Sequence, residues 1–312
     1  MHCYAEKNSE KKFAQMSTQI KPIDTEPVNY GSRKRNRYQF NSKNIFGKGA
    51  FGIVYRCVDN INNRDVAVKL CKCGHNKEVE ALIRLRGTKN VIELLHHHRI
   101  HAQLQLIVME AACGGELYSR VKTHGYICEE MAQLYFGQMV HGVKGMHRKG
   151  VVHRDLKLEN VVFAEPNSEK LYWVDLGLAD TFERMGTDTF YQHKLDTIVG
   201  SKSYVAPEAL LGAPFDGFKA DVWSLGICLF AMVVGTFPVD CANSSNVHVQ
   251  IIANAQRDDR NGIRALLQAV APSCDLSKEL LNLLNALLQV DPTQRPSVFN
   301  LGRFDWLQVD NR

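Results

Sequence analysis

Residues 153–160 read His-Arg-Asp-Leu-Lys-Leu-Glu-Asn, and a second string, Asp175-Leu176-Gly177, follows fifteen residues after Asn160. Further strings stand around this pair in a fixed order. They are GKGAFG at 47–52, VAVK at 66–69, APE at 206–208, DVWSLG at 221–226, and Arg295 after Asp291-Pro292. Taken singly, each string could be ordinary loop or core. All of them occurring together, in this order and with these gaps, is very improbable by chance. The set as a whole therefore decides the fold.

The glycine string at 47–52 suits a phosphate, because glycines let the backbone approach closely and leave amides to donate. Such a string alone is a weak signal, and a dinucleotide-binding site would need a helix directly after it. Residues 53–58 instead have the pattern of a strand, so we expect a hairpin turn over a phosphate. The next strand ends in Lys69, whose ammonium could pair with two phosphates of a nucleotide, although an exposed lysine on a strand is usually only solvated.

Residues 38–109 are β-rich, and the pattern becomes mostly helical after Gly115. Alternating and β-branched residues predict strands at 51–58, 65–70, 91–95 and 104–109, with one helix at 76–86. In the second part, apolar spacing predicts helices at 129–148, 221–234 and 276–288. A small β-rich part followed by a larger helical part indicates two lobes with a cleft between them.

On these strings the chain resembles the eukaryotic protein kinase family, from about Tyr38 to Leu307. The residues at 114–118 and 153–160 look most like the calcium/calmodulin- and AMP-activated-kinase group, which is of the Ser/Thr type. The resemblance implies an α+β, bilobal fold with a small β-rich N-lobe (38–110), a larger helical C-lobe (114–308) and an ATP cleft between them. Residues 1–37 would then be a basic tail, which we expect to be weakly ordered.

The resemblance also assigns roles to the charged residues of the strings. Asp155 should accept the proton of the substrate hydroxyl, and Lys157 should offset the charge of the transferring group. Lys69 should hold the α- and β-phosphates of ATP, and Glu78 should pair with Lys69, with Glu80 as the fallback. Glu78 follows Lys69 by only nine positions, which is a shorter connection than most relatives have.

Asn160 and Asp175 match the family's metal ligands, and hard oxygen ligands suit Mg²⁺, for which Mn²⁺ could substitute. Backbone groups of the hinge at 110–112 should contact adenine, with Met109 at the gatekeeper position. Val54, Ala67 and Val162 would form apolar walls, although a core role is equally natural for them. The predicted ATP-binding residues are Gly47, Lys48, Gly49, Ala50, Phe51, Gly52, Val54, Ala67, Lys69, Met109, Glu110, Ala112, Glu116 and Val162.

Two features favour Ser/Thr over Tyr as the acceptor: the sequence Asp155-Leu156-Lys157, and Gly200-Ser201 ahead of the APE string. Ser201 is therefore a predicted substrate-binding residue. Glu116 and Glu159 match positions that in related kinases often receive a basic residue upstream of the acceptor. This predicts a preference for Arg before Ser/Thr, through carboxylate–guanidinium pairs. Alternatively, Glu116 only contacts the ribose of ATP.

Residues 175–208 should form the activation segment. Thr197 lies eleven residues before Glu208, where related kinases carry an activating phosphate. Arg154 is the kind of group that would bind this phosphate, and an upstream kinase would add it. Rival sites are Thr187, Thr189, Tyr191 and Ser203. The plain alternative is a flexible loop that is not phosphorylated.

The 312 residues carry a net charge of +5, of which residues 1–40 supply +4 through eight Lys/Arg and four Asp/Glu, leaving +1 for the rest. This weighs against nucleic-acid binding, which needs a basic face. No apolar run reaches about 18 residues, so no membrane contact is expected. Nine cysteines, an odd number, indicate reduced thiols. We expect a cytoplasmic or nuclear monomer whose partners are protein substrates.

Three clusters could serve purposes outside this function. The basic cluster at 33–37 could serve nuclear import or an acidic partner, but a solvated tail is the simpler interpretation. Cys71, Cys73 and His75 invite a metal site, yet they lack a fourth ligand from a nearby motif, so a strand-end coincidence is favoured. The histidines at 96–98 and 101 fall between two expected strands, where a solvated turn is favoured over metal binding.

Two rival functions remain. A pseudokinase that binds nucleotide or partners without catalysis would need a lesion at Lys69, Asp155, Asn160 or Asp175, and the sequence has none. A small-molecule kinase of related fold is the second rival. The APE string and the helical lobe after it argue against that rival, because they shape a peptide-docking surface in the family that this chain resembles.

Overall fold

The computed structural model describes residues 37–49, 51–72, 76–101, 104–185, 189–190 and 194–308. Several residues singled out in the sequence lie outside this description. They are Ala50, Cys73, His75, Thr187, Tyr191, the basic residues at 33–35 and the side chain of Thr189.

The chain divides into two compact units. The small unit consists of the residues up to Val79 together with Glu93–Ala111, and the large unit consists of Glu80–Ile92 together with Ala112–Arg312. The division falls inside one helix, α2 (Asn76–Leu85).

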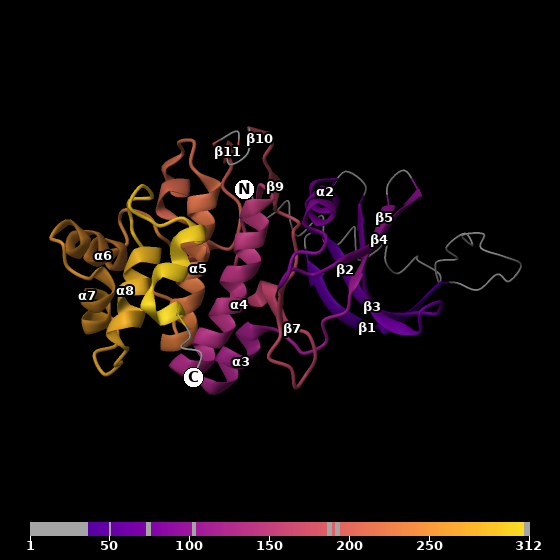
Figure 1. The fold of residues 1–312 in the computed structure, drawn as a ribbon, viewed down its shortest axis with the longest axis horizontal. Helices are drawn as coiled ribbons and strands as arrows, with labels where there is room; N and C mark the ends of the chain where they lie inside the picture. Colours follow the sequence, from indigo (N-terminus) through magenta and orange to yellow (C-terminus); the bar gives the residue numbers. More distant parts are fainter. Residues whose placement is uncertain are drawn as a thin grey trace, which may run out of the picture. The chain divides into compact units, whose positions relative to one another are not determined.

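The small unit is built on one antiparallel sheet with the strand order β1-β2-β3-β5-β4, drawn in indigo and purple in Figure 1. Its strands are β1 (Tyr38–Gly49), β2 (Gly52–Asp59), β3 (Arg64–Lys72), β4 (Leu94–His101) and β5 (Leu104–Glu110). All five strands belong to hairpins, β1–β2, β2–β3 and β4–β5, in which neighbours in the sequence are neighbours in the sheet. This arrangement agrees with the β-rich pattern of the sequence.

The register gives the two faces of this sheet different side chains. Ala67 of β3 lies opposite Met109 of β5, and Lys69 lies opposite Val54 of β2. Because side chains alternate along a strand, these four residues share one face. The other face carries a buried apolar cluster of Tyr38, Cys57, Val66, Val68, Leu70, Leu106 and Val108. Burial of this cluster stabilises the sheet and leaves the face of Lys69 for other contacts.

The structure corrects the prediction for residues 91–101. The strand begins at Leu94 and runs to His101, so the histidines at 96–98 lie within β4 and not in a turn. Pairing with β5 supports them, since His97 Nε2 lies 3.1 Å from Gln105 Oε1 and the rings of His96 and His98 stack at 6.1 Å. Among the residues that the structure describes, no group of three His, Cys, Asp or Glu could hold a metal ion.

The large unit is mainly helical, and α4 (Glu129–Arg148) and α5 (Gly217–Val234) lie side by side in it (Figure 1). Its other α-helices are α3 (Leu117–His124), α6 (Val247–Arg257), α7 (Gly262–Val270) and α8 (Lys278–Leu287). Short strands pair as β6 (Val151–Val152) with β9 (Asp180–Thr181), β7 (Val161–Phe163) with β8 (Leu171–Trp173), and β10 (Arg184–Met185) with β11 (Thr189–Phe190). The 3₁₀ helices are Leu158–Asn160, Lys202–Tyr204, Pro207–Leu211, Val298–Arg303 and Asp305–Leu307. The β-sheet unit and the helical unit confirm the predicted α+β class.

Helix α5 is apolar nearly all round, and its ends are well defined. The Asp216 side chain accepts hydrogen bonds from the amides of Phe218 and Lys219, and Gly235 ends the helix with a φ of 80°. The helix therefore begins ahead of the expected residue 221. By length and composition α5 could cross a membrane, but 72% of its apolar window is buried inside the protein, as in a core helix.

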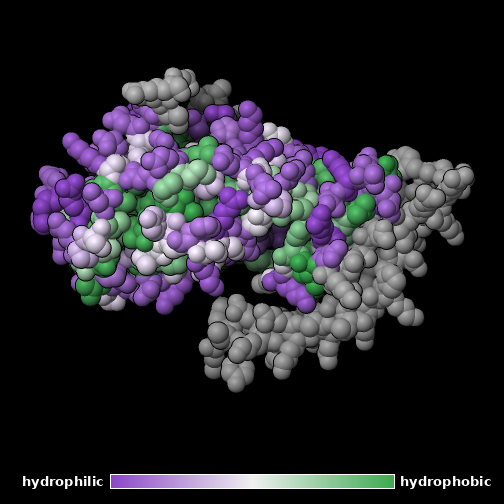
Figure 2. All heavy atoms as spheres, turned by 90° about the horizontal axis from the view of Figure 1, so that it is seen from below, coloured by the Kyte–Doolittle hydropathy of each residue, from purple (hydrophilic) through white to green (hydrophobic). Residues whose placement is uncertain are grey.

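Figure 2 shows one face of the molecule coloured by hydropathy. Hydrophilic side chains cover much of its described surface, and hydrophobic areas lie between them. Large hydrophobic residues that are exposed include Phe46, Ile61, Tyr126, Leu211 and Val247. Exposed hydrophobic residues of this kind are ordinary on a protein surface, so they assign no function.

Candidate active site

Lys69 lies on β3, and a carboxylate holds its ammonium. Its Nζ donates to Glu78 Oε1 at 2.6 Å, and the two residues are buried, with 4% and 1% of their surface exposed. Glu78 lies in the first turn of α2, so the short connection after Lys69 still brings them together. Glu80, the fallback, instead accepts a hydrogen bond from Thr181 Oγ1 at 2.9 Å. A buried ammonium needs such a partner, because removing an ion from water is costly.

The glycine string forms the turn between β1 and β2, where Gly49 pairs with Gly52. Gly52 has a φ of 147°, and a Cβ there would lie 2.2 Å from the Leu70 carbonyl oxygen, so only glycine fits. At Gly47 and Gly49, by contrast, a Cβ would meet no atom within 4 Å. The turn thus has room beside two of its glycines, as a site for phosphates requires. Lys48 lies between them and is exposed, and the Phe51 ring lies 5.7 Å from Lys69 Nζ.

Two of the predicted adenine-wall residues, Val54 and Ala67, share the sheet face of Lys69. The predicted gatekeeper Met109 lies on the same face. Ala67 and Met109 are buried and Val54 is half-buried, so an aromatic base on this face would meet apolar side chains. The amide of Glu110 donates to the Glu93 carbonyl at 3.0 Å, so this hinge amide is already engaged.

Asp155 follows β6 and is the centre of a compact polar cluster in the large unit. Its Oδ1 accepts hydrogen bonds from the amide and the hydroxyl of Ser201, both at 2.9 Å. Its Oδ2 lies 2.7 Å from Lys157 Nζ and 3.3 Å from Asn160 Nδ2. Lys157 Nζ also donates to Ser201 Oγ at 2.9 Å. A lysine, an amide and a serine therefore orient one carboxylate, and Asp155 itself is 8% exposed.

Asp221 of α5 fixes the loop that carries Asp155. Its carboxylate is 1% exposed and accepts hydrogen bonds from the amides of His153 (2.9 Å) and Arg154 (3.0 Å). His147 Nε2 lies 2.9 Å from the same carboxylate. The Arg154 backbone is left-handed, with a φ of 68°, and these hydrogen bonds hold it in that conformation. The core helix thus sets the position of the residue that follows, which is Asp155.

Asn160 and Asp175 come together through the hairpin of β7 and β8. The Val174 amide donates to the Asn160 carbonyl at 2.9 Å, which places the next residue, Asp175, close to Asn160. Asn160 Nδ2 donates to the Asp155 carbonyl at 2.9 Å, and this leaves the amide oxygen pointing away. Asp175 is exposed, with a φ of 58°. An amide oxygen and a carboxylate close in space are ligands that fit Mg²⁺.

Two acidic residues lie near this cluster. Glu159 Oε2 accepts a hydrogen bond from the Tyr204 hydroxyl at 3.0 Å. Glu116 forms an isolated bridge with Val162, which places that predicted ATP-binding pair together. Burial and the negative charge of Glu159 raise the pKa of Glu116. The negative charge of Glu159 thus disfavours the ionised form of Glu116, and a cation between the two carboxylates would relieve that repulsion.

Arg154 and the predicted regulatory residue Thr197 are in contact, but not through the threonine hydroxyl. Arg154 Nη2 donates to the Thr197 carbonyl at 2.7 Å, and Nη1 donates to Asp180 Oδ2 at 3.2 Å. The Thr197 hydroxyl donates to Asp196 Oδ1 at 2.9 Å, and Thr197 is exposed. Ser203, a rival site, donates to the Asp240 carbonyl at 3.3 Å.

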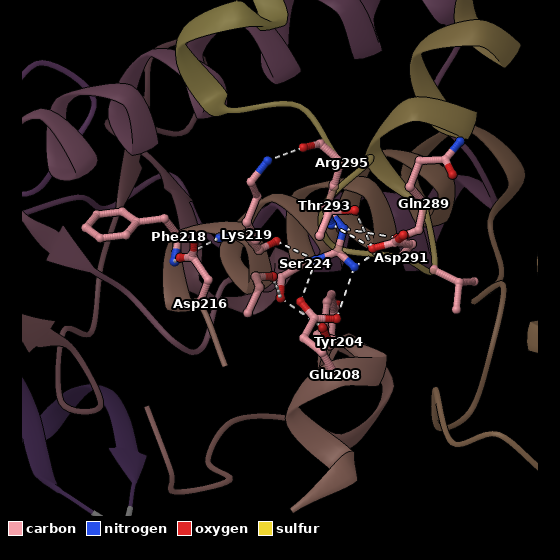
Figure 3. A network of polar contacts seen from close by, with 12 residues as sticks. Tyr204, Glu208, Asp216, Phe218, Lys219, Ser224, Gln289, Asp291, Thr293 and Arg295 are labelled. Atoms are coloured by element: carbon pink, nitrogen blue, oxygen red, sulfur yellow. Dashed lines mark hydrogen bonds and ion pairs between the residues drawn. The ribbon is translucent and has the colours of Figure 1, made fainter. Parts of the chain in front are cut away.

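A buried ion pair joins the APE string to Arg295, as Figure 3 shows. Arg295 Nη1 and Nη2 donate to the two oxygens of Glu208 at 2.6 and 3.1 Å, and their side chains are 0% and 8% exposed. Arg295 also donates to the carbonyls of Lys219 and Gln289. These bonds satisfy the guanidinium in the interior, so the segment after the activation segment is tied to the helical core.

Sequence reasoning missed two residues of this site. Tyr204 supports Glu159, and Asp180 binds Arg154. Tyr204 lies in the gap between Ser201 and the APE string, and Asp180 lies just after Asp175-Leu176-Gly177, so both were within reach of the motifs. Neither residue type is distinctive by itself, however, and only the tertiary contact reveals its role.

Comparisons with known proteins agree with this arrangement. The protein kinase domain family matches residues 40–307. Human NUAK family SNF1-like kinase 1 is 28% identical over 297 residues, covering 92% of this chain and 41% of its own length. CBL-interacting protein kinase 11 of Oryza sativa subsp. japonica is 30% identical over 278 residues, covering 86% and 51%. Serine/threonine-protein kinase chk1 of Schizosaccharomyces pombe is 31% identical over 290 residues, covering 88% and 55%.

The chain spans about half the length of these curated relatives. The family match at residues 40–307 includes every string discussed above except the basic cluster at the start. The family predicted from the motifs is thereby confirmed, and the chain belongs to the protein kinase family, of the serine/threonine type.

Proposed function

We propose that this chain is an active kinase that transfers the γ-phosphoryl group of ATP to Ser or Thr hydroxyls of proteins. The observation that carries the proposal is the oriented carboxylate of Asp155. Its two oxygens contact Ser201, Lys157 and Asn160 within 3.3 Å. A carboxylate held in this way has the geometry of a proton acceptor whose direction is set before the substrate arrives.

Asp155 would accept the proton of the substrate hydroxyl. The Ser201 hydroxyl already donates to Oδ1 at 2.9 Å, which is the type of contact that a substrate Ser or Thr would make with this carboxylate. The hydroxyl oxygen would form a bond to the γ-phosphorus while the bond to the β-phosphate oxygen breaks. Lys157 Nζ, 2.7 Å from Asp155, would offset the charge of the transferring group.

ATP is the second substrate in this proposal. Lys69, held by Glu78, would bind its phosphates, and amides of the β1–β2 turn would cover them. Asn160 and Asp175 would hold Mg²⁺, which when bound neutralises charge on the phosphates. Phosphoryl transfer depends mainly on positioning and charge compensation, and these are the contributions that the residues can make.

Phosphoryl transfer can be tested with γ-labelled ATP, Mg²⁺ and a generic basic peptide, with Asp155→Asn as the control. We expect label on the peptide with the natural chain, and a rate lower by at least about 10²-fold in the variant. A pseudokinase would bind nucleotide without labelling the peptide, and a small-molecule kinase would label neither the peptide nor a protein. Either result would reject the proposal.

A finer proposal concerns the substrate: a basic residue upstream of the acceptor is preferred. Its support is that Glu116 pairs with Val162, three residues after Glu159, and that the charge of Glu159 adds to burial in raising the pKa of Glu116. A guanidinium between two carboxylates forms charge-assisted hydrogen bonds and removes their repulsion. Glu159 is further held by Tyr204 at 3.0 Å, so its position is restrained.

A peptide array in which Arg replaces Ala at each upstream position tests this preference. We expect a gain at one or two upstream positions, which falls in Glu116→Gln and in Glu159→Gln while activity on the all-Ala peptide is kept. An equal response to Arg and Ala at every position would reject the preference without touching the kinase assignment. If Glu116 only contacts ribose, Glu116→Gln will change the KM for ATP and leave the Arg preference intact.

A further inference from the structure

The Arg154 guanidinium lies among acidic groups. Its side chain is only 10% exposed, and it donates to Asp180 at 3.2 Å and to the Thr197 carbonyl at 2.7 Å. Two more carboxylates act on its charge, since burial lowers the pKa of Arg154 whereas Asp180, Asp221 and Asp196 raise it. One cation is thus surrounded by three carboxylates.

Backbone pairing fixes Asp180 in this position. Strands β6 and β9 are antiparallel with Val152 opposite Asp180, and Arg154 follows two residues after Val152. The Arg154 amide is in turn bound to Asp221 at 3.0 Å. Backbone hydrogen bonds therefore hold both residues of the ion pair in place, which brings their side chains together.

Apolar packing holds the part of the activation segment that precedes Thr197. Phe182, directly after β9, and Leu195 belong to one buried cluster together with Val152 and Phe215. Leu195 and Phe215 also exchange both backbone hydrogen bonds at 2.9 Å. None of these contacts uses the Thr197 side chain. Burial and backbone pairing therefore suffice to place the Thr197 carbonyl beside Arg154.

A phosphate on Thr197 would enter an acidic neighbourhood. The Thr197 hydroxyl donates to Asp196 at 2.9 Å, and phosphorylation would replace this donor by a group of about −1.5 to −2 charges. The phosphate would also compete with Asp180 for a single guanidinium. Like charges at this range repel, so the surroundings work against the switch that the position of Thr197 predicts.

We propose that Asp180 is a positioning residue of this kinase: its carboxylate holds Arg154, and through it the loop of Asp155, so that activity does not require a phosphate on Thr197. The proposal rests on the kinase function proposed above. Arg154 precedes Asp155 in the chain, and its side chain joins β9, near the start of the activation segment, to Thr197 near its end. Without the Asp180 charge, this bridge loses one of its two ends.

The test compares the full chain with Asp180→Asn, Asp180→Glu and Thr197→Ala, each treated with phosphatase and checked by mass spectrometry at residue 197. We expect kcat to fall about tenfold in Asp180→Asn, the factor expected for one charge-assisted contact, while the peptide KM changes less than about twofold. Asp180→Glu, which keeps the charge, should retain most of kcat, and Thr197→Ala should stay within about twofold of the natural chain. Asp258→Asn is the matched control, because it removes a carboxylate from an exposed pair with Arg260.

Phosphothreonine installed at residue 197 separates positioning from a merely structural role. In Asp180→Asn the phosphate should restore kcat, because Arg154 then lacks its resident carboxylate. In the natural chain the same phosphate should give no gain. A loss of fold would not be restored by a phosphate, and equal melting temperatures of the variants exclude it independently.

Two results would overturn the proposal. One is undiminished kcat in Asp180→Asn without phosphate, and the other is a gain of tenfold or more on phosphorylation of the natural chain. If no form of the chain labels a peptide, the kinase function itself fails. Hydrogen exchange at residues 194–200 then still tests whether Asp180 holds this segment through Arg154. If it does, exchange there is faster in Asp180→Asn and unchanged in Asp258→Asn.

Discussion

At the scale of single residues, the proposed chemistry depends on the few contacts that orient the carboxylate of Asp155. Asp155 Oδ1 accepts two hydrogen bonds from Ser201, one from its amide and one from its hydroxyl, each at 2.9 Å. Lys157 bridges the other oxygen and the same hydroxyl. The hydroxyl of Ser201 is thus the link between the proton acceptor and the cation beside it.

Removing that hydroxyl should impair catalysis more than folding. We expect Ser201→Ala to lower kcat about tenfold, since a hydrogen bond to a charged group contributes about 1.5–3 kcal/mol and the amide contact remains. Ser201→Thr, which keeps a hydroxyl, should stay close to the natural rate. Steady-state kinetics at saturating ATP measures both variants, and equal rates for Ala and Thr would contradict the role of the hydroxyl.

The acidic pair gives a pH dependence with a defined sign. Partial burial and Glu159 raise the pKa of Glu116 above its ordinary value of 4.5, so Glu116 takes up a proton at a higher pH than an isolated glutamate does. As the pH falls, Glu116 loses its charge first and attracts an upstream Arg less. We expect the KM for an Arg-containing peptide to rise on acidification, whereas Glu116→Gln has a flat profile. A parallel rise in the variant would disprove this origin.

At the scale of secondary-structure elements, the sequence predicted an element correctly where neighbouring residues alone determine it. It failed where pairing with a distant segment determines the element. The hairpin over the glycines follows from the strand pattern after them, and helix α4 spans the expected residues 129–148. Strand β4 was placed wrongly, because four histidines read as a polar turn and only pairing with β5 reveals the strand. The contact of Arg154 with Asp180 depends on the pairing of β6 with β9. These strands have two residues each, which is too short for a recognisable sequence pattern.

The β1–β2 turn allows a paired test of two glycines. Gly52→Ala should destabilise the small unit by about 1–3 kcal/mol, because its φ is 147° and the new Cβ would collide with the Leu70 carbonyl. Gly47→Ala meets no atom within 4 Å, so its free energy of unfolding should change little. Urea denaturation followed by circular dichroism measures both. Equal stabilities of the two variants would mean that the turn is not constrained at Gly52.

At the scale of the whole molecule, buried polar contacts tie distant segments into the large unit. Glu208 and Arg295 are 87 residues apart in sequence and form a buried ion pair, which Figure 3 shows. Asp221 of α5 binds the loop of His153 and Arg154. These residues could be identified from the sequence because their motifs occur together in the protein kinase family. Spacing alone did not show which partner each would have, since that depends on the packing of helices far apart in the chain.

Breaking the buried pair should unfold the large unit at milder conditions. We expect Glu208→Gln to lower the free energy of unfolding by about 3–5 kcal/mol, because it leaves the Arg295 guanidinium buried without its carboxylate. Asp258→Asn, in an exposed pair, should cost less than about 1 kcal/mol. Thermal denaturation compares the two, and a similar loss in both would show that burial is not what makes the first pair important.

Binding of ATP with Mg²⁺ through Lys69 and through Asn160 and Asp175 is tested most directly by isothermal titration calorimetry of the full chain. We expect saturable ATP binding that strengthens when Mg²⁺ is added. Lys69→Met should weaken ATP binding both with and without Mg²⁺. Asp175→Asn should abolish only the increase in affinity that Mg²⁺ causes, and leave binding of ATP without Mg²⁺ unchanged. A natural chain that ignores ATP in the presence and absence of Mg²⁺, phosphorylated or not, would contradict the proposed function.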